Sequence, residues 1–334
     1  MSTKSKRDLG QFILSVVDQS PMRRGGNAKE ALQESVRLAQ AVEKWGYQRY
    51  WVAEHHNSSG LASSAPEIVI GQIASKTNTI RVGSGGVMLS HYSALKVAEQ
   101  FRILDTFFPG RIDLGIGRAP GSDHLTAAAL AYPKAPVDIA HFPQQVVDVI
   151  GFLSNTMSEE HPFGKIAALP GPSPDHIPDV WLLGSSDYSA QLAGALGLPF
   201  AFADFFGHTS SHGPRIADLY RNRFKPSGYS QEPKLNVALQ VVCADTDERA
   251  EFLASSRRMG RILGSRSPGS PGGIIPPEIA SAYEPDEQEL AMADQFSQGF
   301  IVGNPDKVRE GIIEASLKYG TNDITVVTNV FYFE

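Results

Sequence analysis

The sequence has a single cysteine, no long apolar run and no concentration of basic residues, and each of these absences excludes a class of protein. One cysteine, Cys243, cannot form an internal disulfide, so the chain fits a reducing compartment and we expect it in the cytoplasm. Cys243 ends the apolar run VALQVVC, which predicts a buried, unreactive side chain. The early apolar run FILSVV is too short for a signal sequence or a membrane span. A net charge of −6 without a basic cluster gives no footprint for nucleic acid.

What the sequence does contain is an alternation of strand-like and helix-like segments over its 334 residues. Amphipathic helical patterns cover 28–46, 93–107 and 305–320, and the strand-like runs between such segments are almost continuously apolar, which is typical of parallel sheets. Eight strands with helical crossovers favour a (β/α)₈ barrel over a doubly wound sheet, and we interpret 1–334 as one domain. The eight predicted strands are 12–18, 49–54, 80–89, 111–117, 179–184, 198–203, 235–243 and 323–328.

Three features interrupt this alternation. Residues 155–178 and 264–286 are rich in proline and glycine and predict two long loops, the second being either a lid or a disordered insertion. After the last strand only Asn329 to Glu334 remain, too few for the helix that should cover it. Either a neighbouring subunit covers that face or the chain is shorter than its relatives.

The tripeptide Glu54-His55-His56 falls at the carboxyl end of the second strand, where catalytic side chains of barrel enzymes collect. Successive strand residues point to opposite faces, so the two histidines are poorly placed to bind one metal, and we expect no metal site. A histidine beside a carboxylate at a strand end favours general acid–base chemistry, although a hydrogen-bonded structural pair is an equal alternative.

Glycines and hydroxyl residues mark the ends of three further strands. Gly83 to Gly86 interrupt the third strand, which indicates either a bulge or the close approach of a flat ligand. Arg118 leaves the end of the fourth strand and is a candidate anion or cofactor contact. Ser185 and Ser186 open a helix after the fifth strand, where they either cap that helix or help to bind an anion.

Taken together, these segments resemble the bacterial luciferase-like monooxygenase family. The likeness is carried by RYWVAEHHN, IRVGSGGVMLSHY, ILDTFFPGRIDLGIGRAPG, LLGSSDYSAQLAGALGLPFAFA and IVGNPDKVREGI, in this order along the chain. Light-emitting members carry a cysteine at the position of Gly117 and a glutamate at that of Gly184, so we expect a non-luminescent member.

The resemblance implies a barrel that binds FMN, usually as reduced FMN delivered by a separate flavin reductase. It also implies that Glu54 and His55 are the active-site carboxylate and histidine. By motif position the flavin contacts would be Gly85, Gly86, Arg118, Ser185, Ser186 and Tyr188. Family members dimerise through the helices after strands two and three, here 65–77, where Gly71, Ala74 and Ser75 would allow close approach.

The resulting hypothesis is a flavin-dependent monooxygenase that acts with oxygen on a small organic substrate, with His55 as the acid–base group oriented by Glu54 and His56 unassigned. A deazaflavin-dependent oxidoreductase of the same fold, which transfers hydride without oxygen, is one alternative. A flavin-binding subunit without turnover is another.

Overall fold

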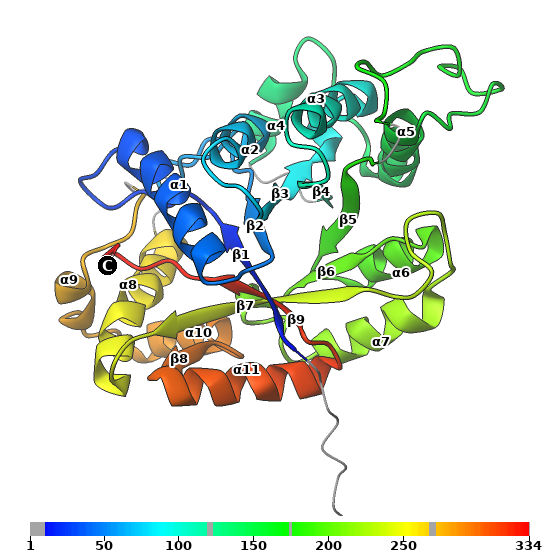
Figure 1. The fold of residues 1–334 in the computed structure, drawn as a ribbon. Helices are drawn as coiled ribbons and strands as arrows, with labels where there is room; N and C mark the ends of the chain where they lie inside the picture. Colours follow the sequence, from blue (N-terminus) through cyan, green and yellow to red (C-terminus); the bar gives the residue numbers. More distant parts are fainter. Residues whose placement is uncertain (1–10, 119–122, 174–175, 267–271, 334) are drawn as a thin grey trace, which may run out of the picture.

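Eight parallel strands close into a barrel surrounded by helices (Figure 1). The computed structural model describes residues 11–118, 123–173, 176–266 and 272–333, the side chains of 264–266 excepted. The strands follow the order β6-β5-β4-β3-β2-β1-β9-β7, and the pairing of β6 with β7 closes the ring. Their bounds are β1 Ile13–Asp18, β2 Arg49–Val52, β3 Arg81–Met88, β4 Ile112–Gly117, β5 Asp179–Gly184, β6 Phe200–Ala203, β7 Leu235–Cys243 and β9 Asp323–Val327. The (β/α)₈ prediction and its eight strands are confirmed.

A ninth strand, β8 (Ile301–Gly303), pairs with the end of β7 outside the ring. Sequence analysis missed it because three residues are too few to show a period. The helices are α1 Ala28–Lys44, α2 Pro66–Ala74, α3 Ala94–Phe107, α4 His124–Ala131, α5 Phe142–Ser154, α6 Asp187–Leu196, α7 Gly213–Arg223, α8 Asp247–Arg266, α9 Pro277–Ser281, α10 Glu287–Phe296 and α11 Pro305–Tyr319. None of the described helices combines the length and the apolar composition needed to cross a bilayer.

Local signals explain where the predicted helices begin and which face they bury. The side chain of Asn27 accepts a hydrogen bond from the backbone N–H of Glu30, so it caps α1. Asn304 caps α11 in the same way, and Pro305 occupies the first turn, where a missing N–H costs nothing. The buried residues of α1 are Ala31, Ser35, Ala39 and Val42, spaced to form one stripe against the sheet.

The barrel interior changes from charged to small side chains along the strand direction. At its amino-terminal end Arg49 pairs with Asp323 (3.0 Å), and the indole N–H of Trp51 donates to Asp113 (2.8 Å). In the middle, Trp51 and Trp181 meet edge to face with ring centres 5.3 Å apart. Toward the carboxyl end of the strands the interior side chains include the small Ala53, and Gly85 of β3 has no side chain, which leaves room at that mouth.

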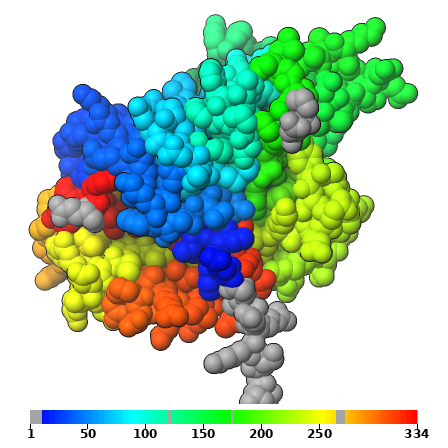
Figure 2. Space-filling model, viewed as in Figure 1, coloured from blue at the N-terminus to red at the C-terminus, as the bar shows by residue number. Residues whose placement is uncertain are grey.

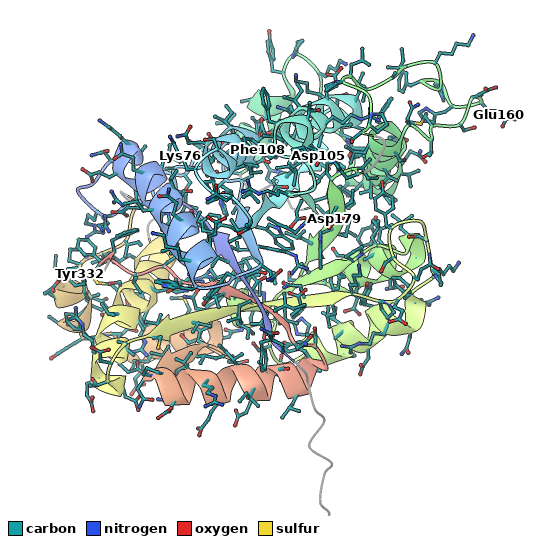
Figure 3. The ribbon with its side chains drawn as sticks, viewed as in Figure 1. Lys76, Asp105, Phe108, Glu160, Asp179 and Tyr332 are labelled. Atoms are coloured by element: carbon teal, nitrogen blue, oxygen red, sulfur yellow. The ribbon has the colours of Figure 1, made fainter. Side chains whose placement is uncertain are left out.

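The predicted loop at 155–178 is confirmed: its described residues form turns and coil, and Glu160 lies at the outer end of the excursion (Figure 3). The prediction for 264–286 was wrong at two places. Residues 264–266 complete the last turn of α8, and Pro277–Ser281 form α9, because proline is favourable in the first turn of a helix. Residues 267–271 lie outside the described part. Cys243 is exposed at the end of β7, so the expectation that it is buried was also wrong.

No helix follows β9 in the described residues 328–333, as the sequence predicts. The tail instead places aromatic rings against arginines of neighbouring helices. Arg37 of α1 lies 4.7 Å from the ring of Phe333, and Arg249 of α8 lies 5.4 Å from that of Tyr332. Figure 2 shows the tail (red) on the surface between α1 (blue) and α8 (yellow).

Candidate active site

The predicted site residues gather at one rim of the barrel. Glu54 and His55 follow β2, Gly85 lies in β3, Arg118 follows β4 and Ser185 follows β5. Because all of these strands are parallel, their carboxyl ends meet at the same rim, which is where barrel enzymes carry their active sites. The fold therefore brings together residues that are 131 positions apart in the sequence, from Glu54 to Ser185.

Glu54 is fully buried and lies at the centre of a polar cluster. Its Oε1 is 2.7 Å from Nε2 of His56 and accepts from the hydroxyl of Tyr92 at 2.8 Å. Its Oε2 accepts from the backbone N–H of Met88 at 3.0 Å. Burial and the neighbouring Glu54 carboxylate raise the pKa of Tyr92, so this phenol stays protonated and donates to the carboxylate.

The expected pairing of Glu54 with His55 is wrong, since the structure gives that place to His56. The ring of His56 also lies edge to face with that of His91, with centres 5.8 Å apart. His55 is held through its backbone, whose N–H donates to the carbonyl of Ser63 at 3.0 Å. Asn57, directly after the two histidines, turns the chain with a positive φ of 51°.

His55 keeps an unused hydrogen-bonding atom. Its Nδ1 is buried and has no partner among the described residues. Burial and the nearby His56 lower the pKa of the ring, which favours neutral imidazole. A neutral ring with an unpartnered nitrogen can exchange a proton with a ligand at the rim.

The glycines of β3 are required first by the neighbouring strand. A Cβ at Gly83 would lie 2.3 Å from the carbonyl oxygen of Asp113, and one at Gly86 would lie 2.8 Å from that of Gly115. Between them the register of β3 against β4 shifts, so a bulge is present, and the Gly85–Gly86 peptide is cis. Only Gly85 faces the interior, where a Cβ would lie 3.0 Å from Cβ of Trp51. Trp51 and Val17 occupy the side-chain direction of Gly85, and the absence of a Cβ leaves its peptide flat enough to lie against a planar ligand.

Arg118 and Tyr188, both predicted flavin contacts, lie against each other. The guanidinium carbon of Arg118 is 4.3 Å from the centre of the phenol ring. Ser186 occupies the N-cap position of α6, but its side chain accepts no hydrogen bond from that helix. The first N–H groups of α6 therefore lack a side-chain cap and suit an anion. The adjacent Asp187 is paired with Arg215 through two contacts of 2.8 Å, which offsets its charge.

Gln240 belongs to no sequence motif, so the sequence did not predict it as a site residue. It pairs in register with Val327, a residue of the interior cluster, and therefore points into the barrel near the rim. It is 1% exposed, and neither of its amide atoms has a partner among the described residues. An unsatisfied buried amide is costly, so its place beneath the rim indicates a ligand contact.

A cavity of 590 Å³, the mouth cavity, opens at the same rim, beyond the ends of β1, β2, β6 and β9. It lies across the barrel from Arg118 and Tyr188. The residues that line it include Gln19, Asn57, Ser59, Phe205, Phe206, Ser256, Arg257, Arg261, Gly272, Ile274 and Asn329. Within the described part of the chain, no group of three His, Cys, Asp or Glu side chains is arranged to hold a metal ion.

Known proteins resemble this chain over most of its length. A family model described as luciferase-like monooxygenase matches residues 9–321. A luciferase-like monooxygenase of Escherichia coli (strain K12) is 40% identical over 96% of this chain and 92% of that protein. The N-acetyl-S-alkylcysteine monooxygenase of Bacillus subtilis (strain 168) is 36% identical over 95% of this chain and 92% of its own length.

Solved structures add the fold. Apo-MsnO8 superposes with a TM-score of 0.87 at 35% identity, covering 97% of this chain and 94% of that one. The oxygenating constituent of the 3,6-diketocamphane monooxygenase of Pseudomonas putida, solved with FMN, has a TM-score of 0.69 at 19% identity, covering 97% and 94%. An F420-dependent secondary alcohol dehydrogenase has a TM-score of 0.67 at 15% identity, covering 97% and 96%. At these last two identities the likeness concerns the fold alone.

Proposed function

The chain belongs to the luciferase-like monooxygenase family, and from this premise we propose that it is a flavin-dependent monooxygenase using reduced FMN and oxygen on a small organic substrate. Bound reduced FMN would supply two electrons, so that one oxygen atom enters the substrate and the other leaves as water. The observation that carries the proposal is the unpartnered, buried Nδ1 of His55, which follows β2, the strand that neighbours the glycine-bearing β3.

Different residues at the rim would bind different parts of the flavin. Gly85, with Gly86 next to it, would lie against the planar ring system. Arg118 and Tyr188, together with the start of α6 at Ser185 and Ser186, would hold the phosphate. The amide of Gln240 would offer its NH2 group as donor and its carbonyl oxygen as acceptor to polar atoms of the bound ligand.

His55 would give or take the proton at Nδ1 during oxygenation, since a neutral ring can do both in turn. Glu54 does not orient His55 in this structure. It holds His56 and Tyr92 instead, so we propose that Glu54 fixes the wall of the site and that His56 belongs to this wall.

Two further proteins enter the proposal as partners. A separate flavin reductase would deliver reduced FMN, and a second copy of the chain would form a homodimer through the α2–α3 side. The 36% identity to an N-acetyl-S-alkylcysteine monooxygenase makes a thioether of this kind the first substrate to test.

The test is turnover with chemically reduced FMN and ¹⁸O₂. We expect one labelled oxygen atom in the product of N-acetyl-S-benzylcysteine, an aliphatic aldehyde or an alkanesulfonate, tried in turn. A His55→Gln variant should keep FMN binding and lose oxygen transfer, by roughly 10²–10⁴-fold if the histidine acts as an acid–base group.

Two outcomes would contradict the proposal. Oxygen consumption no greater than that of free reduced FMN with all three substrates would favour a flavin-binding subunit without turnover. Tight binding of reduced deazaflavin, with oxygen-independent hydride transfer, would favour the related class represented by the F420-dependent dehydrogenase.

A further inference from the structure

Two arginines of α8, Arg257 and Arg261, stand out because they are largely buried without a counter-ion. The guanidinium of Arg257 donates to the carbonyl of Phe205 at 3.2 Å and lies 5.2 Å from the ring of Phe300. Its Nε is buried and has no partner among the described residues. Arg261 lies 5.3 Å from the ring of Phe296. In the part of the chain that the structure describes, no carboxylate comes within ion-pair distance of either.

The neighbouring Arg258 has the usual environment of an arginine on a helix surface. It is exposed, and its guanidinium lies 3.8 Å from Glu251 on the same helix. Burial is the main cause that lowers the pKa of Arg257, to about 9, with the proximity of Arg261 adding to it. A buried cation without an anion is unfavourable, so such a pair is retained where a ligand supplies the missing charge.

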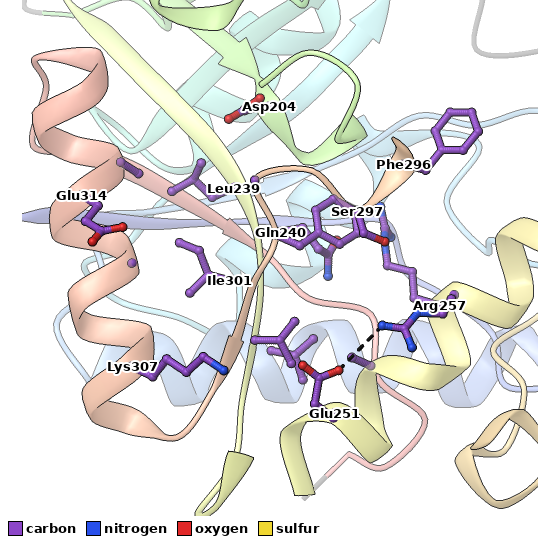
Figure 4. A pocket seen from close by; sticks show the side chains of 18 of the residues that line it. Asp204, Leu239, Gln240, Glu251, Arg257, Phe296, Ser297, Ile301, Lys307 and Glu314 are labelled. Atoms are coloured by element: carbon purple, nitrogen blue, oxygen red, sulfur yellow. Dashed lines mark ion pairs between the residues drawn. The ribbon is translucent and has the colours of Figure 1, made fainter. Parts of the chain in front are cut away.

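The two arginines separate the mouth cavity from a second cavity of 620 Å³, the side cavity, between α8, α10 and α11 (Figure 4). The side cavity has acidic residues of its own, among them Glu251, Glu310 and Glu314, and Lys307 extends into it from α11. Of the described residues that line the mouth cavity, by contrast, Arg257 and Arg261 are the only ones with ionisable side chains. The mouth cavity is therefore the one whose charge an anion would balance.

An independent observation points to a ligand in the same place. Ser256, next to Arg257, lines the mouth cavity and is 2% exposed. Its hydroxyl oxygen is buried and makes no hydrogen bond among the described residues. Phe205 and Phe206, whose ring centres are 4.5 Å apart, line the same cavity and give it an apolar surface.

We propose that the mouth cavity binds a small organic anion, with its carboxylate held by Arg257, Arg261 and the hydroxyl of Ser256 and its apolar part against Phe205 and Phe206. Its location across the barrel from Arg118 and Tyr188 separates this anion from the flavin phosphate. The identification of this anion as the substrate rests on the proposed function. The existence of the anion-binding site is independent of that function.

The experiment measures binding of N-acetyl-S-benzylcysteine and of its primary amide, which has the same shape without the charge, by titration calorimetry. The wild-type protein should bind the carboxylate at least about tenfold more tightly than the amide. Arg257→Gln and Arg261→Gln should each weaken carboxylate binding about tenfold to a hundredfold and leave amide binding unchanged. Arg257→Lys, which keeps the charge, should retain part of the preference.

Arg258→Gln is the matched control, since it removes an exposed, paired arginine of the same helix, and its binding should equal that of the wild type. Retained FMN binding in each variant shows that the barrel is folded. Equal binding of carboxylate and amide by the wild type, absence of binding by both, or unchanged carboxylate binding in both glutamine variants would overturn the proposal. If the protein prefers the carboxylate to the amide but transfers no oxygen, the anion site is supported and only the monooxygenase proposal fails.

Discussion

Tyr92 donates to a carboxylate that has no access to water, so its hydroxyl should matter for stability. A Tyr92→Phe substitution removes this donor and leaves Glu54 with His56 and the N–H of Met88. We expect the free energy of unfolding to fall by about 1.5–3 kcal/mol, because hydrogen bonds to charged groups are worth that much. Urea denaturation measures it. Tyr132→Phe, at an 82% exposed tyrosine, should change nothing, and equal stability of both variants would contradict the assigned network.

His55 should make stability depend on pH in a predictable direction. Its pKa is lower in the folded protein than the ordinary value of about 6.5, so below that pH the unfolded chain binds more protons at this ring. Its contribution to stability is therefore complete above about pH 6.5 and is lost as the pH falls toward the folded-state pKa.

A His55→Gln variant should consequently lose less stability than the wild type between about pH 7.5 and pH 5.5, the range around the ordinary histidine pKa. Chemical denaturation at both pH values gives the difference. His124→Gln, at an exposed residue that begins α4, should keep the wild-type dependence. If the His55 variant has the same dependence as the wild type, the ring is not held neutral by the fold.

At the scale of single residues, the sequence predicted positions better than partners. Glu54 and His55 could be located because an apolar run ends just before them and parallel strands place such ends at one rim. Their partners could not be predicted, because both histidines lie within two residues of the carboxylate and only the packed structure shows that His56 reaches it. Arg257 and Arg261 belong to no motif. They are candidate ligand contacts because they are buried without a counter-ion, and only the packed structure shows this burial.

Among the elements, β3 and β4 approach each other most closely where their glycines lie. A Gly83→Ala substitution would place Cβ 2.3 Å from the backbone oxygen of Asp113, in a strand that is buried throughout. The two strands would have to separate, and we expect a loss of about 1–3 kcal/mol or more. Gly228→Ala is the control, because a Cβ there meets nothing within 4 Å. Thermal and urea unfolding of both variants measure the change in stability. A Gly83→Ala protein as stable as the wild type would contradict the close approach of β3 and β4.

The sequence located the elements of the barrel because their apolar runs and amphipathic helices have clear periods. It failed where local composition misleads. The residues 264–266 look like loop, yet they continue a helix that begins at Asp247, and Pro277 reads as a breaker although it begins α9. The glycines of β3 indicated either a bulge or a ligand. The structure contains the bulge, and Gly83 and Gly86 are required by the close approach of β4, whereas Gly85 faces the interior.

At the scale of the whole molecule, the proposed dimer needs a surface. Of the three small residues expected to provide it, Gly71 and Ala74 are turned inward and Ser75 is exposed. A Cβ at Gly71 would lie 3.4 Å from the side chain of Leu104 on α3, and Ala74 is 1% exposed. The same two helices expose large apolar side chains instead, namely Ile68 (71%) on α2 and Phe107 (72%) on α3. In the proposed dimer the partner would cover these two exposed side chains.

We therefore expect Ile68→Lys combined with Phe107→Lys to halve the molar mass measured by light scattering, while the barrel stays folded because neither side chain is buried. Leu317→Lys is the matched control: it is 51% exposed on α11, away from α2 and α3, and should leave the mass of the wild type unchanged. A dimer that survives the double substitution would show that the chain associates through another face. Retained FMN binding by the resulting monomer would further show that the rim residues hold the flavin without help from a second copy.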